Sequence, residues 1–150
     1  MLLLLVVEII HPEQPAVFNA ILSVEDNEIH AYALKRSLTN MGYSVTVSDC
    51  GVAAVDMARQ REFDAVLLDL NLPDIDGFSV CGLIRALPGG KKPAVIFYSA
   101  SVASMAKVQR AADLCADGYL TYPIDAEHLD AVLRGTIARR QLSTTTTEDQ

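Results

Sequence analysis

Short apolar runs alternate with longer stretches of helical periodicity along most of this sequence, and this alternation constrains the fold more than any other feature. The apolar runs are Ala20 to Val24, Tyr43 to Val47, Ala65 to Leu68, Ala94 to Tyr98 and Gly118 to Leu120. Near-continuous apolar strands are buried on both faces, which is typical of parallel strands joined by helical crossovers. We therefore predict an α/β fold, a doubly wound five-stranded parallel sheet with helices on both faces.

The stretches between and after these runs predict the helices. Their ranges are Glu28 to Met41, Gly51 to Gln60, Phe78 to Leu87, Ala103 to Leu114 and Ala126 to Arg140. In the first of them Ala31, Leu34 and Leu38 share one face, and Gly42 follows as a stop signal. Asp125 precedes the last helix and is a candidate N-cap.

The two ends of the chain lie outside this pattern. We predict a leader or arm over residues 1–17, one domain over 18–140 and a disordered polar tail over 141–150. The apolar run Met1 to Ile10 is too short to span a bilayer and lacks the charged start and cleavage site of a signal peptide. We expect it to form an extra strand or an irregular arm, and docking on a partner chain is the alternative.

The composition excludes some classes of function. The formal net charge is -7 with no cluster of Lys and Arg, so we expect no direct binding to nucleic acid. Cys50, Cys81 and Cys115 form neither a CxxC pair nor an even framework, which favours reduced thiols in the cytoplasm. The sequence leaves open whether the chain stands alone or belongs to a larger protein, and whether it forms a homodimer.

Acidic residues stand at the ends of two predicted strands. Glu25 and Asp26 follow the first strand, and Asp69 follows the third. Ligands of such a sheet bind beyond the carboxyl ends of its strands, so we expect the three carboxylates to meet at one edge. Crowded carboxylates repel one another unless a cation neutralises them, and Mg²⁺, which shares its shell with water and phosphate oxygens, fits best. The sequence therefore predicts a Mg²⁺ site that handles phosphoryl groups.

Asp69 is the best candidate nucleophile, because it ends the middle strand of the five, whereas Glu25 and Asp26 can hold the ion from one side. One of its carboxylate oxygens can attack phosphorus in line and form an acyl phosphate. Ser99 and Ala100 follow the fourth strand, where a hydroxyl and a backbone N–H can meet the remaining phosphoryl oxygens.

Four segments resemble, in the right order and spacing, the signature segments of response-regulator receiver domains. They are Ala20 to Asn27, Val66 to Gly77, Val95 to Ala100 and Gly118 to Asp125, within a resemblance that covers about Phe18 to Arg140. The resemblance implies a flavodoxin-like (βα)5 receiver fold in a two-component phosphorelay. It also implies Mg²⁺ as cofactor and a sensor histidine kinase or phosphotransfer protein as partner.

The resemblance also assigns roles to single residues. It implies that Glu25 and Asp26 form the acidic pair and that Asp69 is both phosphoacceptor and metal ligand. It further implies that the backbone carbonyl of Asn71 binds the metal, that the Ser99 hydroxyl meets the phosphoryl group, and that Tyr119 is the aromatic switch. Such a chain is no enzyme beyond catalysing its own phosphoryl transfer and dephosphorylation.

One position departs from the family pattern. Tyr122 stands where the family has a lysine, just before the proline of the last segment, in a residue–proline peptide that the resemblance implies is cis. In the family that lysine pairs with the phosphoryl group, and a charge-assisted bond of this kind contributes about 1.5–3 kcal/mol. We expect weakened phosphorylation, because Lys91 and Lys92 precede the fourth strand and so lie at the opposite end of the sheet.

The three histidines show no ligand or triad spacing. We interpret His11, His30 and His128 as ordinary surface or helix residues and not as phosphodonors, although His30, in the first turn after the acidic pair, can approach the rim of the pocket.

Three other functions compete with the phosphoacceptor. The main alternative is a degenerate receiver that acts as a phosphorylation-independent interaction module, which the Tyr122 replacement favours. A phosphatase of the haloacid-dehalogenase type expects a second aspartate two residues after the nucleophile, where this chain has Asn71. A mononucleotide binder expects a phosphate loop after the first strand, where Glu25 and Asp26 would repel phosphate.

Overall fold

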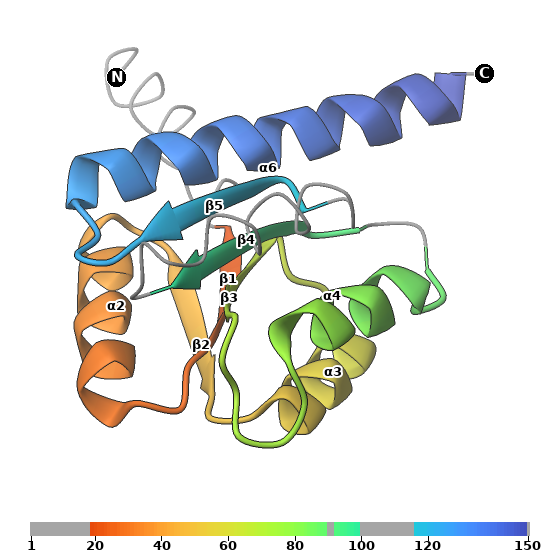
Figure 1. Cartoon of the computed structure of the whole chain (residues 1–150). Helices are drawn as coiled ribbons and strands as arrows, with labels where there is room; N and C mark the ends of the chain where they lie inside the picture. The colour runs from red at the N-terminus through yellow and green to blue at the C-terminus, as the bar shows by residue number, and fades with distance from the viewer. Residues whose placement is uncertain (1–18, 90–91, 100–115, 150) are drawn as a thin grey trace, which may run out of the picture.

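The computed structural model of the protein describes residues 19–89, 92–99 and 116–149 (Figure 1). The predictions for the leader 1–17, for Ala100, for the helix from Ala103 to Leu114 and for Cys115 lie outside these residues. Among the residues that the structure describes, no helix combines the length and the apolar content that crossing a membrane requires.

The described strands form one parallel sheet. They are β1 (Ala20–Val24), β2 (Ser44–Ser48), β3 (Ala65–Asp69), β4 (Ala94–Ser99) and β5 (Gly118–Thr121). They pair in the order β2-β1-β3-β4-β5, and every pair is parallel. The fold class predicted from the apolar runs is confirmed. The order reverses between β1 and β3, so the carboxyl ends of these two strands flank the switch point where such sheets bind ligands.

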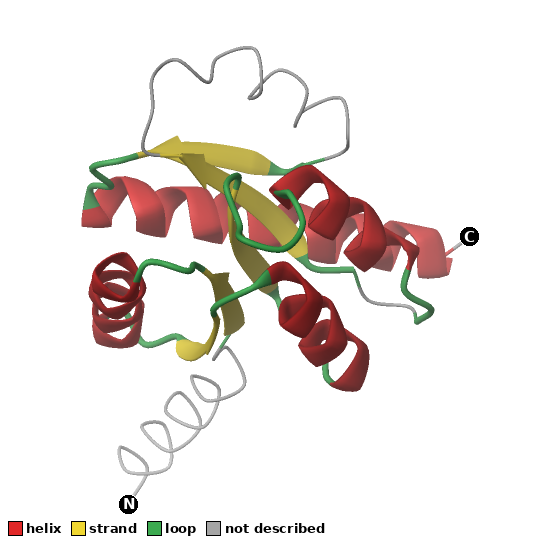
Figure 2. Ribbon diagram, turned by 60° about the horizontal axis from the view of Figure 1, so that its bottom comes forward, coloured by secondary structure: helices red, strands yellow, loops and turns green. Residues whose placement is uncertain are grey.

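Helices cover both faces of the sheet, as Figures 1 and 2 show. They are α2 (Glu28–Asn40), α3 (Gly51–Gln60), α4 (Gly77–Ala86) and α6 (Ala126–Asp149). Alternate residues of each strand point to opposite faces, which produces two separate cores. One core joins α3 and α4 to Leu22, Val66 and Phe97, and the other joins α2 and α6 to Ile21, Leu67 and Ile96.

Helix ends near the carboxyl edge are fixed by local side chains. The Asn27 carboxamide oxygen accepts hydrogen bonds from the backbone N–H groups of Ile29 and His30, both at 3.0 Å, so α2 starts directly after the acidic pair. Asp125 caps α6 as predicted, accepting from the N–H of His128 at 3.1 Å. At its other end, α2 is followed by Gly42, whose φ of 98° is a conformation that favours glycine.

The helix α6 is longer than predicted. It continues to Asp149, so the segment 141–150, predicted as a disordered tail, is helical as far as that residue. Neither proline nor glycine follows Arg140 to interrupt the helical hydrogen bonds. Threonine is less favourable than alanine in a helix by only about 0.5 kcal/mol per residue. The polar composition therefore misled the prediction of this end.

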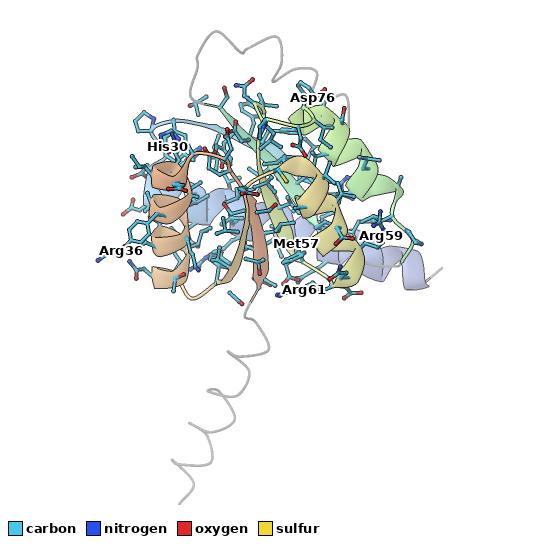
Figure 3. All side chains as sticks on the ribbon, turned by 90° about the horizontal axis from the view of Figure 1, so that it is seen from below. His30, Arg36, Met57, Arg59, Arg61 and Asp76 are labelled. Atoms are coloured by element: carbon cyan, nitrogen blue, oxygen red, sulfur yellow. The ribbon has the colours of Figure 1, made fainter. Side chains whose placement is uncertain are left out.

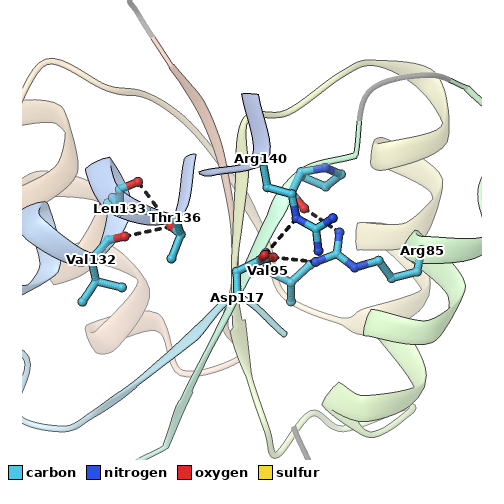
Figure 4. A network of polar contacts seen from close by, with 8 residues as sticks. Arg85, Val95, Asp117, Val132, Leu133, Thr136 and Arg140 are labelled. Atoms are coloured by element: carbon cyan, nitrogen blue, oxygen red, sulfur yellow. Dashed lines mark hydrogen bonds and ion pairs between the residues drawn. The ribbon is translucent and has the colours of Figure 1, made fainter. Parts of the chain in front are cut away.

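A polar network ties α6 to the sheet at the edge opposite the acidic strand ends (Figure 4). The Asp117 carboxylate accepts from Arg85 Nη2 at 2.6 Å, from the N–H of Val95 at 2.8 Å and from Arg140 Nε at 2.8 Å. Arg85 also donates to the carbonyl of Pro93 at 2.6 Å. The network thus links α4, the start of β4, the residue before β5 and the middle of α6.

Candidate functional site

Three carboxylates meet where β1 and β3 end. One oxygen from each of Glu25, Asp26 and Asp69 lies within 4.8 Å of the others. They line a pocket of about 260 Å³ whose wall also includes Asn71. Glu25 is buried at 3% exposure, Asp69 is half-buried and Asp26 is exposed, so the cluster opens to solvent on one side. This is the meeting of acidic side chains that the strand ends predicted.

Glu25 is held in place by its surroundings. Its Oε2 accepts a hydrogen bond from the hydroxyl of Tyr98 at 2.6 Å, and its Oε1 accepts from the N–H of Asn27 at 3.0 Å. Burial, and then the neighbouring Glu25, raises the pKa of Tyr98, which keeps its hydroxyl protonated as a donor. These bonds stabilise a carboxylate that would otherwise be costly to bury.

Asp69 has a strongly perturbed acidity. Burial is the main reason that the pKa of its carboxyl is raised to about 7, and Glu25 and Asp26 add to the rise. The N–H of Asn71, which donates to Asp69 Oδ1 at 3.0 Å, opposes the rise. Ionising this carboxyl is costly without a cation nearby, so a bound cation would stabilise its ionised form.

The loop after β3 is anchored at both sides. The Asp74 carboxylate accepts from the N–H groups of Gly51 and Val52 at 2.9 and 2.8 Å, which holds its pKa at about 2 and fixes the loop to the start of α3. Gly77 begins α4 so close to the strand end that an added Cβ would lie 2.7 Å from the carbonyl oxygen of Asp69. The loop therefore packs tightly under the proposed nucleophile.

The rings of His30 and Tyr122 also line the pocket. His30 stacks on Tyr122 with 4.5 Å between the ring centroids and 25° between the planes. His30 Nδ1 lies 3.6 Å from Glu25 Oε1. Figure 3 shows His30 at the end of α2 that lies at the same edge as Asp76, the cap of α4, whereas Arg59 and Arg61 lie toward the opposite edge. His30 is thus part of the site and more than an ordinary helix histidine.

The main chain at Tyr122 continues the sheet. Its N–H donates to the carbonyl of Ser99 at 2.9 Å, and the peptide bond to Pro123 is cis. Burial, and then Glu25 and Asp69, raises the pKa of Tyr122 to about 12, so the residue faces the acidic pocket as a neutral phenol. Lys92 lies before β4 as predicted, and its ammonium donates to the carbonyl of Leu87.

Comparisons with known proteins identify the family. The family model described as the response regulator receiver domain matches residues 21–134. The chain belongs to this family. The chain is 32% identical over 137 residues to the virulence sensor protein BvgS of Bordetella pertussis, covering 89% of this chain and 11% of that protein. It is 34% identical over 119 residues to the response regulator MprA of Mycobacterium leprae, covering 79% of this chain and 51% of that protein.

Solved receiver domains share the fold. A receiver domain from Methylobacillus flagellatus has 32% identity and a TM-score of 0.73, over 79% of this chain and 98% of that one. The receiver domain of a sensor histidine kinase from Pseudomonas aeruginosa, solved with a magnesium ion coordinated in its active-site cleft, has 30% identity and a TM-score of 0.73. That match covers 80% of this chain and 98% of the other. The chain spans from a tenth to half of the curated relatives named above.

The two residues predicted as the receiver switch lie on one face of the sheet. Ser99 is buried at the end of β4, and Phe97, two residues earlier, pairs in register with Tyr119 of β5. Side chains two apart and side chains paired across strands point to the same face, so Ser99 and Tyr119 share it. Tyr119 is 51% exposed, and its ring is therefore turned toward solvent rather than packed in the core.

Sequence reasoning missed Tyr98 and underestimated His30. A tyrosine at the end of an aliphatic strand, in register with Asp69, carries a hydroxyl that needs a partner once buried, and in the folded chain this partner is Glu25. For His30 the signal was its place in the first turn of α2, because helical side chains lean toward the N-terminus and hence toward the acidic pair.

Proposed function

We propose that Asp69 of this receiver domain accepts a phosphoryl group from a histidine of a sensor kinase or phosphotransfer protein, with Mg²⁺ bound by the acidic cluster. One observation carries the proposal. Asp69 ends β3 at the switch point of the sheet, with oxygens of Glu25 and Asp26 within 4.8 Å, in a pocket open to solvent. The family of the chain and the kinase and regulator names of its relatives support it.

The phosphoryl transfer replaces a P–N bond of the donor with an O–P bond to Asp69. A carboxylate oxygen of Asp69 attacks the phosphorus in line, and an O–P bond forms while the P–N bond to the donor imidazole breaks. The electron pair of that bond stays on the imidazole nitrogen, which takes a proton from water. Asp69 is left as an acyl phosphate.

The donor set of the pocket suits Mg²⁺. Glu25, Asp26 and Asp69 offer hard carboxylate oxygens at one half-open site, and the Asn71 carbonyl is proposed as a further ligand. The ion, when bound, would neutralise charge on the carboxylates and on the phosphoryl oxygens. The fixed contacts of Glu25 with Tyr98 and Asn27 hold one side of this set in position before any ligand arrives.

The output of the switch is proposed to run through Ser99 and Tyr119. The Ser99 hydroxyl, with the backbone N–H of Ala100, would bind phosphoryl oxygens, and the exposed Tyr119 ring would turn inward beside Ser99. The face around β5 and the start of α6 would then differ between the two forms. We further infer that the protein is cytoplasmic and makes no direct contact with nucleic acid. The proposal is compatible with a monomer or a homodimer.

Phosphorylation by a small donor tests the proposal. The full chain is incubated with acetyl phosphate and either Mg²⁺ or a chelator, and the intact mass and the modified residue are read by mass spectrometry. We expect one phosphoryl group on Asp69, and only in the presence of Mg²⁺. Asp69→Asn should remain unmodified, whereas Asp56→Asn, a matched change at an exposed aspartate of α3, should behave as wild type.

An absence of modification would favour the alternative. A wild-type chain that binds Mg²⁺ but neither gains a phosphoryl group nor binds beryllofluoride is a degenerate receiver, and its partners would then recognise a constitutive surface. The replacement at Tyr122 is the observation that keeps this outcome open.

A further inference from the structure

The pocket around Asp69 is rich in oxygen acceptors. A phosphoryl group adds acceptor oxygens to three carboxylates that already lie together. Of the described side chains that line the pocket, none is a lysine or an arginine. The hydroxyl of Tyr98 is engaged by Glu25, so it is not free to turn toward a phosphoryl group. A donor in the remaining wall would therefore add to the contacts proposed for Ser99 and Ala100.

His30 is the ring donor in that wall. An imidazole carries at least one N–H in either protonation state. Its Nδ1 lies 3.6 Å from Glu25 Oε1, which places the ring beside the carboxylates, with the side chain 39% exposed. The backbone N–H of His30 is bonded to the Asn27 cap, and the first turn of α2 is thereby fixed.

Tyr122 holds the imidazole in position. The two rings stack at 4.5 Å, and Tyr122 is itself tilted against Tyr98 with 5.9 Å between the centroids. Tyr98 is fixed by its hydrogen bond to Glu25, and the N–H of Tyr122 is fixed by the carbonyl of Ser99. Three rings from β4, from the end of β5 and from α2 therefore support each other along one side of the pocket.

We propose that His30 is a phosphoryl-binding residue of this site, whose imidazole N–H donates a hydrogen bond to an oxygen of the phosphoryl group on Asp69, with Tyr122 as its positioning residue. This inference rests on the proposed function of Asp69. It assigns to the start of α2 a role in holding the phosphoryl group, and it makes the replacement at Tyr122 part of an alternative donor arrangement.

Beryllofluoride binding to the full chain tests this role, because its fluorines stand in for the phosphoryl oxygens and report their contacts in ¹⁹F NMR. His30→Phe keeps a ring against Tyr122 but removes the N–H. We expect it to weaken beryllofluoride binding about tenfold, the equivalent of one hydrogen bond, and to shift one bound ¹⁹F resonance. His30→Gln, which restores an N–H donor, should recover most of the affinity. His128→Phe, a matched change at an exposed histidine of α6, should bind as wild type.

The outcomes separate the two proposals. If wild type binds beryllofluoride and His30→Phe binds equally well with an unchanged ¹⁹F spectrum, His30 makes no such contact. His30 is equally ruled out as a donor if His30→Gln loses as much affinity as His30→Phe, because packing would then explain the loss. A wild type that binds Mg²⁺ but no beryllofluoride overturns the phosphoacceptor function, and the role of His30 with it. Circular dichroism of each variant excludes unfolding as the cause of a loss.

Discussion

The network around Asp117 should be a main anchor of α6, and Asp117→Ala tests this. The substitution removes the acceptor of three hydrogen bonds, from Arg85, Val95 and Arg140. The side chains of Arg85, Asp117 and Arg140 are only 16%, 17% and 28% exposed, so water replaces the lost partner poorly. Breaking a buried ion pair costs about 3–5 kcal/mol, and the remaining bond from Arg85 to Pro93 favours the lower end. We expect a loss of about 3 kcal/mol.

Urea unfolding followed by circular dichroism measures this loss. With a denaturant slope of about 2 kcal/mol per molar, the midpoint should fall by about 1.5 M. Asp56→Ala is the matched control, because it also removes an aspartate paired with an arginine. Arg59 and Asp56 are 60% and 55% exposed, and such surface pairs contribute less than about 1 kcal/mol.

Comparing Asp117→Ala with Asp56→Ala shows whether burial strengthens the network around Asp117. If Asp117→Ala lowers the midpoint no more than Asp56→Ala does, burial adds nothing to this network. The anchoring of α6 would then rest on its apolar residues, such as Leu129, Leu133 and Ile137, and on the hydrogen bond from the Tyr43 hydroxyl to Asp130.

Three further changes probe the acidic pocket. Gly77→Ala should cost about 1–3 kcal/mol in urea unfolding, because the new Cβ would lie 2.7 Å from the Asp69 carbonyl oxygen. Asp74→Ala should speed amide hydrogen exchange at Gly51 and Val52, whose N–H groups lose their acceptor. In metal-free buffer, burial raises the pKa of Asp69 from 3.8 to about 7, so ionisation destabilises the fold as pH rises through this range. Asp69→Asn should therefore be more stable than wild type by about 1 kcal/mol near pH 8, after screening by water, and should lose this advantage near pH 4.

The sheet was predictable from sequence because its strands are buried on both faces. For β1 the apolar run and the observed strand coincide at Ala20–Val24, and the other four strands differ from their runs by no more than one residue at either end. The acidic cluster was predictable for the same reason, since the carboxyl ends of parallel strands must share one edge. Neither result needed knowledge of any side-chain contact.

Contacts between side chains from distant segments were not predictable. Periodicity places His30 near the start of α2, but only the folded chain brings Tyr122 against it. In the same way the pairing of Arg140 with Asp117 depends on how α6 crosses the sheet. The end of α6 was mispredicted because the polar composition of 141–150 was weighed above the absence of any residue that breaks a helix.

The residue at position 122 affects the backbone of the site and its charge in different ways. The Tyr122 N–H still bonds to the Ser99 carbonyl, so the change of side chain leaves the path of the last segment tied to β4. What differs from the pattern that the sequence resemblance implies is the wall beside Asp69, where a neutral phenol stacked on His30 occupies the position expected to carry a lysine. The charge of a phosphoryl group must then be offset by the metal and by hydrogen-bond donors. Retention of the phosphoryl group should consequently depend on Mg²⁺ and on His30 more steeply than it would in a variant with lysine at position 122.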